Sequence, residues 1–241
     1  MRVPVQRYRR RHVSHTSRYI HRKTRQKRLK KLESVGFAVT KDPAFESAEK
    51  DYEVEAEFAE KVLADKAHIF EFPYYSSYVQ TIDAESSLLP EPPRRLLFIG
   101  SGPVPLSAIL YKQKFPLARV DILDIDPVAL RVGGRVARKV GTPLDKEILG
   151  DAATIGGLDQ YDAVVVALEA GPTDTAKRAV LNGLLSRVGP QTTLLVRGSP
   201  NVGGSEFVNT RKLLPTNAAV FGSVVTFDSY GETIAVRSVK Q

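Results

Sequence analysis

A short glycine-rich segment, "GSGPVP" at residues 100–105, has the residue types of a ligand-binding turn. Gly100 and Gly102 can adopt backbone conformations that other residues avoid, and they let a ligand approach the main chain closely. Ser101 places a hydroxyl between them. We predict that these three residues bind a ligand, although paired glycines also occur in turns that are purely structural.

Two aspartates follow the next two apolar segments in the same way. Asp124 in "LDIDP" could accept hydrogen bonds from both ribose hydroxyls of a nucleoside, and Asp151 in "GDA" could accept one from an adenine amino group. Asp126 is expected to cap the following helix instead. Together with the glycine turn, these positions predict a nucleoside site. The alternative is a set of independent turns and caps.

The glycine turn does not have the residues that usually hold phosphates. It lacks the third glycine of the dinucleotide pattern, it contains Pro103 and Pro105, and no Walker lysine follows it. A sulfonium nucleoside has no phosphate and therefore fits the turn better.

Glu55 is the candidate general base. On a helical wheel of residues 48–63 it lies among apolar side chains, whereas four other glutamates lie on the opposite side, which is expected to face solvent. These are Glu49, Glu53, Glu57 and Glu60. A carboxylate on an apolar face is costly, and its burial would raise its pKa toward that of a useful base. The alternative is a boundary residue or an ion pair, for example with Arg94.

The elements that must position these residues alternate along the chain from residue 95 onward. Apolar segments predict strands at 95–102, 119–126, 146–151, 161–170, 192–198, 218–228 and 233–239, and helices at 105–114, 127–141 and 174–189. Only "SYGE" joins the last two strands, which predicts an antiparallel hairpin. We therefore expect an α/β fold, a doubly wound Rossmann-like sheet with a C-terminal antiparallel hairpin and a small N-terminal helical segment. This architecture is typical of S-adenosylmethionine-dependent transferases.

Composition limits the classes of protein that the chain could be. It has 241 residues and no cysteine, which excludes disulfides, thiolate catalysis and cysteine-ligated metal. No apolar run approaches the roughly 18 residues that span a bilayer. We expect a soluble, cytoplasmic protein with no membrane span.

The net charge of +8 arises from one end of the chain, because residues 1–31 carry 13 Lys or Arg and no acidic residue. We predict a basic arm at 1–41, a helical and aromatic cap segment at 42–93 and a Rossmann-like S-adenosylmethionine-binding domain at 94–241. The arm could bind nucleic acid or anionic lipid, and the alternative is a tail without ordered structure.

Several motifs together resemble those of the nicotianamine synthase family. They are "FPYYSSY" at 72–78, "IDAE" at 82–85, "GSGPVPLSAI" at 100–109 and "DIDPVA" at 124–129. The resemblance covers about residues 48–200 and extends to bacterial relatives that make opine-type metallophores. It implies transfer of the 3-amino-3-carboxypropyl group of S-adenosylmethionine to an amine, with release of methylthioadenosine.

The resemblance also assigns site residues. The family's essential glutamate corresponds to Glu55, its active-site tyrosine to Tyr78 and its ribose-binding aspartate to Asp124. The asparagine that usually precedes the tyrosine is Ser77 here. A sulfonium ion favours aromatic faces, so Tyr74 is expected to contact the nucleoside, while Tyr78 orients the amine. Packing between helix and sheet is expected for at least one of Phe72, Tyr74 and Tyr75.

The expected product is nicotianamine or a related metal-chelating metallophore. S-adenosylmethionine acts as a substrate, and no metal is required. The acceptor is a small-molecule amine or a second S-adenosylmethionine, nucleic acid could be bound only through the arm, and a homodimer is a possible assembly. Two alternative functions remain. One is an S-adenosylmethionine-dependent methyltransferase that acts on a small molecule or RNA, and the other is a non-catalytic RNA-binding module on a degenerate form of the fold.

Overall fold

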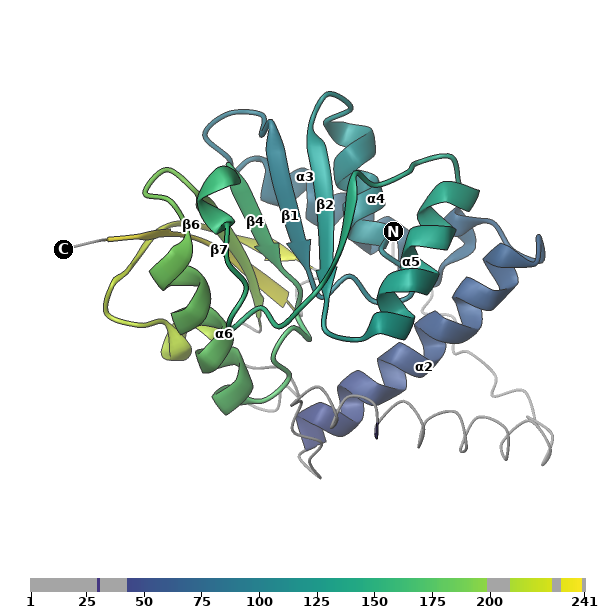
Figure 1. Cartoon of the computed structure of the whole chain (residues 1–241), viewed down its shortest axis with the longest axis horizontal. Coiled ribbons are helices and arrows are strands. Elements are labelled where there is room, and N and C mark those ends of the chain that lie inside the picture. Colours follow the sequence, from purple (N-terminus) through teal and green to yellow (C-terminus); the bar gives the residue numbers. More distant parts are fainter. Residues whose placement is uncertain (1–29, 31–42, 199–208, 227–230, 240–241) are drawn as a thin grey trace, which may run out of the picture. The chain divides into compact units, whose positions relative to one another are not determined.

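Seven strands form one mixed sheet in the computed structural model of the chain, in the order β3-β2-β1-β4-β5-β7-β6 (Figure 1). The strands are β1 (Arg95–Ile99), β2 (Arg119–Asp124), β3 (Lys146–Leu149), β4 (Ala163–Val166), β5 (Thr193–Gly198), β6 (Ala218–Thr226) and β7 (Gly231–Ser238). The first five strands are parallel, and β7 pairs antiparallel with both β5 and β6. The predicted doubly wound sheet and its reversed hairpin are confirmed.

The structure describes residues 30, 43–198, 209–226 and 231–239. Apart from Lys30, these residues belong to one compact unit, Thr40–Gln241. The basic arm predicted at 1–41 lies outside the described residues except for Lys30, and so do residues 229 and 230 of the predicted hairpin turn. The predicted division into segments at 41 and 93 stays a prediction.

Side chains of the central strands alternate between two apolar layers. In β1, Leu96 and Phe98 belong to one layer, and Leu97 and Ile99 belong to the other. The first layer is covered by α2 (Pro43–Leu63), α3 (Tyr75–Ser86), α4 (Leu106–Lys114) and α5 (Pro127–Lys139), and the second by α6 (Asp174–Arg187). Short 3-10 helices are η1 (Ile69–Glu71), η2 (Leu158–Gln160) and η3 (Thr210–Leu213). In Figure 1, α3 and α4 lie behind the sheet and α6 lies in front of it.

The predicted wheel for α2 is right on its apolar side and wrong at one glutamate. The buried residues of this side are Phe58, Ala59 and Val62. The exposed glutamates are Glu53, Glu57 and Glu60. Glu49 was expected to face solvent, but it is only 4% exposed. A wheel records the angle around one helix, and it cannot show which other segments pack against that helix.

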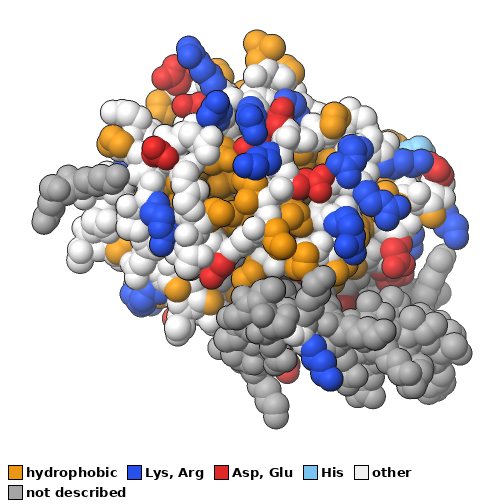
Figure 2. All heavy atoms as spheres, viewed as in Figure 1, with side chains coloured by type: hydrophobic (Ala, Val, Ile, Leu, Met, Phe, Trp, Pro, Cys, Tyr) orange, Lys and Arg blue, Asp and Glu red, His pale blue; other side chains and the backbone are white. Residues whose placement is uncertain are grey.

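Helix α5 begins as predicted. The Asp126 side chain accepts a hydrogen bond from the Val128 N–H at 2.8 Å, and Pro127 occupies the first helical position. The outer side of the helix is basic, and Lys and Arg side chains gather over it in Figure 2. The exposed basic residues of α5 are Arg131, Arg135, Arg138 and Lys139.

Within the described ranges, no helix is long and apolar enough to cross a membrane.

Candidate active site

The glycine turn directly follows β1, at the edge of the sheet where the parallel strands end. Gly100 and Gly102 have φ angles of 79° and 64°. A residue with a side chain would adopt such a left-handed conformation only at a cost of about 1–2 kcal/mol. A Cβ on Gly100 would lie 3.1 Å from the Cβ of Ala170 and 3.2 Å from that of Ala167. The loop after β4 therefore packs so closely on the turn that it leaves little room for a side chain there.

Ser101 lies inside this turn. It is only 4% exposed, and its hydroxyl has no hydrogen-bond partner among the described residues. A buried hydroxyl without a partner is costly. A bound ligand could supply that partner, and the role predicted for Ser101 stays a prediction.

Asp124 ends β2 beside the turn, and backbone amides fix its orientation. Its Oδ2 accepts a hydrogen bond from the Gly102 N–H, and its Oδ1 accepts one from the Asp126 N–H, both at 2.8 Å. Each carboxylate oxygen can accept more than one hydrogen bond. The geometry is therefore compatible with additional hydrogen bonds from ribose hydroxyls, which stay a prediction.

The other two predicted nucleoside contacts lie at the surface. Asp151 is exposed after β3, and its Oδ1 accepts a hydrogen bond from the Ala153 N–H at 2.8 Å. Tyr74 is 58% exposed just before α3, with its ring centroid 6.0 Å from that of Phe72. Both side chains are accessible to a ligand, and their contact with a nucleoside stays a prediction.

Helix α2 lies beyond the carboxyl ends of β1 and β2 and brings Glu55 onto the glycine turn (Figure 1). A Cβ placed on Gly102 would lie 2.5 Å from Oε2 of Glu55. Burial, followed by the negative charges of Asp51 and Asp124, raises the pKa of the Glu55 carboxyl to about 8. The wheel therefore singled out a carboxyl that lies at the predicted ligand turn and can accept or release a proton near neutral pH.

This close approach makes Gly102→Ala a sensitive test of the geometry. The added methyl group would push aside the Glu55 carboxylate, which is the movable end of a flexible side chain. We therefore expect weaker S-adenosylmethionine binding, with a free energy of unfolding lowered by only the roughly 1–2 kcal/mol cost of the left-handed conformation. Gly141→Ala is the matched control, because Gly141 has a φ of 76° but no atom within 4 Å of an added Cβ. Thermal unfolding should show a similar loss of stability in both variants, whereas calorimetry should show weaker S-adenosylmethionine binding in Gly102→Ala alone. Equal effects of the two variants on binding would contradict the contact with Glu55.

Tyr78 lies in the first turn of α3 and is the last residue of the aromatic segment at 72–78. Its ring centroid is 6.1 Å from that of Phe72, which lies 5.1 Å from that of Phe58 on α2. Phe72 is only 5% exposed, so the packing explanation is confirmed for this residue. Burial, followed by the charge of Glu55, raises the pKa of the Tyr78 phenol. The hydroxyl therefore stays protonated and can donate a hydrogen bond.

A pair of hydrogen-bonded carboxyl groups lies beside Glu55, and the sequence analysis missed it. Asp51 precedes Glu55 by one helical turn of α2, and its side chain is hydrogen-bonded to that of Glu169. Burial, followed by this hydrogen bond, raises the pKa of Glu169 well above its usual range. A carboxyl group can donate a hydrogen bond only when it is protonated, and the raised pKa favours the protonated form of Glu169. The position of Glu169 just after β4, at the ligand edge of the sheet, was the signal that could have found it.

Lys177 on α6 holds the loop that carries Glu169. Its ammonium group donates hydrogen bonds to the carbonyl oxygens of Ala167 and Leu168, at 3.0 and 2.9 Å. Burial lowers the pKa of Lys177 to about 7, although the charge of Glu169 acts in the opposite direction. Carboxyl groups from α2, β2 and the β4 loop lie together near the glycine turn. A cationic ligand at this place would favour their ionised forms.

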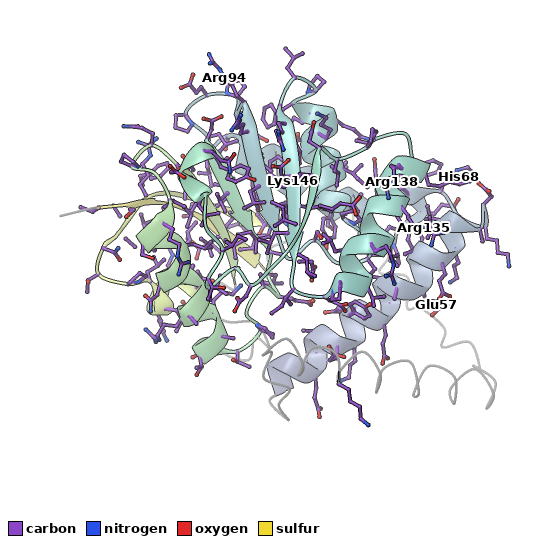
Figure 3. All side chains as sticks on the ribbon, viewed as in Figure 1. Glu57, His68, Arg94, Arg135, Arg138 and Lys146 are labelled. Atoms are coloured by element: carbon purple, nitrogen blue, oxygen red, sulfur yellow. The ribbon has the colours of Figure 1, made fainter. Side chains whose placement is uncertain are left out.

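The alternative of an ion pair between Glu55 and Arg94 is wrong. Arg94 precedes β1 and lies at the opposite end of that strand from α2, as the labels of Arg94 and Glu57 show in Figure 3. Its backbone N–H donates to Asp162 instead.

Within the described parts of the chain, no group of three or more His, Cys, Asp or Glu side chains has an arrangement that could hold a metal ion.

Comparison with known proteins gives a consistent family. The family model for nicotianamine synthase protein matches residues 45–222, which is more than half of the chain. Nicotianamine synthase 1 from Arabidopsis thaliana is 30% identical over 55% of this chain and 44% of its own length, and nicotianamine synthase 3 from Oryza sativa subsp. japonica is 30% identical over 57% and 43%. The chain thus spans less than half the length of these relatives.

Solved structures share the fold. MtNAS in complex with MTA and tNA superposes with a TM-score of 0.63 at 24% identity, over 78% of this chain and 71% of that chain. The N-methyltransferase NodS from Bradyrhizobium japonicum, in complex with S-adenosyl-L-homocysteine, reaches 0.55 at 16% identity, over 77% and 99%. These likenesses confirm the Rossmann-like fold of S-adenosylmethionine-dependent transferases. The family model, which matches more than half of the chain, shows that the chain belongs to the nicotianamine synthase family.

Proposed function

We propose that the chain transfers the 3-amino-3-carboxypropyl group of S-adenosylmethionine to an amine and releases methylthioadenosine. The product is nicotianamine or a related metal-chelating metallophore. Membership of the nicotianamine synthase family supports this proposal, and so does a mutant of MtNAS that was solved in complex with S-adenosylmethionine, at 23% identity to this chain.

The observation that carries the proposal is the position of Glu55. Its carboxyl group lies over Gly102, in the turn predicted to hold the nucleoside, and its pKa is about 8. A base is useful at this place because an amine acceptor is mostly protonated near neutral pH and must lose a proton to attack. A protein that only binds the nucleoside would have little use for such a carboxyl.

The proposed reaction needs no metal, because the sulfonium is already an activated leaving group. The lone pair of the acceptor nitrogen attacks the γ-carbon of the aminocarboxypropyl group, and a carbon–nitrogen bond forms. The carbon–sulfur bond breaks, and its electron pair returns to sulfur, which gives neutral methylthioadenosine. Glu55 accepts the proton that the amine loses. The protein contributes mainly the in-line placement of nitrogen and carbon.

The site residues divide between the two parts of this reaction. Gly102, Ser101 and Asp124 hold the nucleoside, with contacts from Gly100 and from the exposed side chains of Tyr74 and Asp151. Tyr78 donates a hydrogen bond that orients the amino-acid groups of the substrates. The carboxyl group of Asp51, which is hydrogen-bonded to Glu169, adds to the negative potential that attracts the sulfonium and the acceptor.

Product analysis by mass spectrometry tests the proposal. The protein is incubated with S-adenosylmethionine alone and with candidate amines, and each mixture is compared with a Glu55→Gln control. We expect methylthioadenosine together with an acceptor that carries the added amino-acid chain. Methylated products with S-adenosylhomocysteine would instead identify the chain as a methyltransferase. A cytoplasmic location, a homodimer and nucleic-acid binding through the arm stay predictions of the sequence.

A further inference from the structure

A buried ion pair anchors the second half of α3, the helix that carries Tyr78. The Glu85 carboxylate is 0% exposed, and Arg197 donates to it twice, from Nε to Oε1 and from Nη2 to Oε2, both at 2.8 Å. Thr233 donates to Oε1 at 2.6 Å, and Tyr111 donates to Oε2 at 2.7 Å. Each oxygen of Glu85 thus accepts two hydrogen bonds, and the donors belong to β5, β7 and α4.

Arg197 extends this cluster toward the glycine turn. Its Nη1 donates to Ser107 Oγ at 2.8 Å, and its guanidinium lies over the ring of Phe98, 5.3 Å from the centroid. Ser107 lies in the first turn of α4, just after the glycine turn. Burial alone would lower the pKa of Arg197, but the charge of Glu85 and its hydrogen bonds outweigh burial and raise it. Arg197 therefore stays charged.

Burying two charged groups costs desolvation energy, and apolar side chains could hold a helix in place without that cost. Replacing a buried ion pair by apolar residues of similar size is often neutral or stabilising, so stability alone does not account for it. A bidentate pair between a guanidinium and a carboxylate fixes direction as well as distance, because both groups are planar. The cluster therefore fixes both the rotation of α3 about its axis and its position along that axis.

Tyr78 is the site residue that this anchoring affects. It lies seven residues before Glu85 on α3, which places the two on the same side of the helix about 10 Å apart along its axis. Burial and then the charge of Glu55 raise the pKa of the Tyr78 phenol, and the positive charge of Arg197 partly offsets them. Arg197 is therefore close enough to Tyr78 to influence its hydroxyl.

We propose that Glu85 and Arg197 are positioning residues for the transfer: they hold α3 in the orientation that directs the Tyr78 hydroxyl toward the reacting amine. This inference rests on the proposed function. A displacement of about 1 Å in a reacting group can lower a rate by up to about 10²-fold. Loosening the cluster should therefore reduce turnover before it reduces binding.

Two mild substitutions loosen the cluster and leave the ion pair intact. Thr233→Val and Tyr111→Phe each remove one hydroxyl that donates to Glu85, so neither leaves a buried charge unpaired. Tyr161→Phe is the matched control, because the buried Tyr161 hydroxyl donates to the buried Asp121 carboxylate at 2.8 Å in the other apolar layer. All three variants lose one hydroxyl-to-carboxylate hydrogen bond of the same kind.

Turnover numbers in two backgrounds test the proposal. We expect Thr233→Val and Tyr111→Phe to lower kcat by about 3- to 30-fold and to leave the KM for S-adenosylmethionine within about twofold of the wild type. Tyr161→Phe should leave kcat unchanged. In a Tyr78→Phe background, the first two variants should cost no further activity, because they act through the hydroxyl that is already absent. Equal losses in both backgrounds, or unchanged kcat in folded variants, would overturn the proposal.

A second measurement does not depend on the reaction. In protein labelled with 3-fluorotyrosine, the fluorine resonance that disappears in Tyr78→Phe belongs to Tyr78. We expect this resonance to shift or broaden in Thr233→Val and in Tyr111→Phe, but not in Tyr161→Phe. The last two variants each also lose the signal of the tyrosine that is replaced. If the wild type transfers no group, the proposed function fails, and the fluorine spectra still decide whether the cluster positions Tyr78. An unchanged Tyr78 resonance would refute the positioning role even in an active enzyme.

Discussion

Replacing Glu55 by Gln is expected to lower turnover by roughly 10²–10⁴-fold, the usual contribution of a positioned general base. The substitution keeps the size and shape of the side chain but removes its basicity. Binding of S-adenosylmethionine should survive, because the nucleoside is held by the glycine turn and Asp124. Steady-state kinetics and calorimetry measure the two effects separately.

The pH dependence should identify the same group. Because the pKa of Glu55 is about 8, only a minority of the carboxyl groups are ionised at neutral pH. We expect kcat/KM of the wild type to rise about tenfold per pH unit below that value and then to level off. Glu55→Gln should lack this step and regain part of its activity at higher pH, where more of the acceptor is free amine.

Stability provides the control for this substitution. The folded pKa of Glu55 lies above its ordinary value of 4.5, so the folded state binds the proton more tightly than the unfolded state does. Stability should therefore decrease as the pH rises from about 4.5 to 8, and Glu55→Gln should remove that decrease. Glu57→Gln, on the exposed side of α2, should change neither turnover nor this profile. Normal turnover in Glu55→Gln would limit Glu55 to a structural role.

Replacing Asp124 by Ala should weaken S-adenosylmethionine binding by about 5- to 150-fold. The change removes the acceptor for the ribose hydroxyls, and it also frees the N–H groups of Gly102 and Asp126 that Asp124 holds in place. Leaving such groups without partners costs about 1–3 kcal/mol, which corresponds to that range of dissociation constants. Isothermal titration calorimetry with S-adenosylmethionine measures the loss.

Asp162→Ala is the matched control for this prediction. The Asp162 carboxylate also accepts two backbone N–H groups, those of Arg94 and Arg95, both at 2.8 Å. It does so at the opposite end of β1, away from the glycine turn. We expect Asp162→Ala to lower the melting temperature with no change in affinity. Unchanged affinity in Asp124→Ala, or an equal loss in both variants, would contradict the assignment of the ribose site.

The sequence predicted the features that depend on neighbours within one element. The strand ends at Gly100 and Asp124, the cap at Asp126 and the inward side of α2 at Glu55 all follow from local spacing. They locate the ligand edge of the sheet and one candidate base. The expected ion pair with Arg94 and the expected exposure of Glu49 are wrong for the same reason. A helical wheel or a strand boundary does not show which other elements pack against that helix or strand.

The contacts that complete the site join residues far apart in the chain. Glu85 and Arg197 are 112 positions apart, and the pair of Asp51 with Glu169 joins α2 to the loop after β4. The sequence carries no local signal for which buried carboxyl group faces which partner. Such pairs depend on how α2 and α3 lie on the sheet, and only the three-dimensional structure determines that.

A double-label experiment tests the proposed transfer most directly. The protein is supplied with S-adenosylmethionine that carries one isotope in its methyl group and another in its carboxyl carbon, and the acceptor product is separated from the nucleoside product. The proposed reaction places the carboxyl label in the acceptor and leaves the methyl label in methylthioadenosine. The methyl label in the acceptor, with the carboxyl label retained in S-adenosylhomocysteine, would show methyl transfer and contradict it.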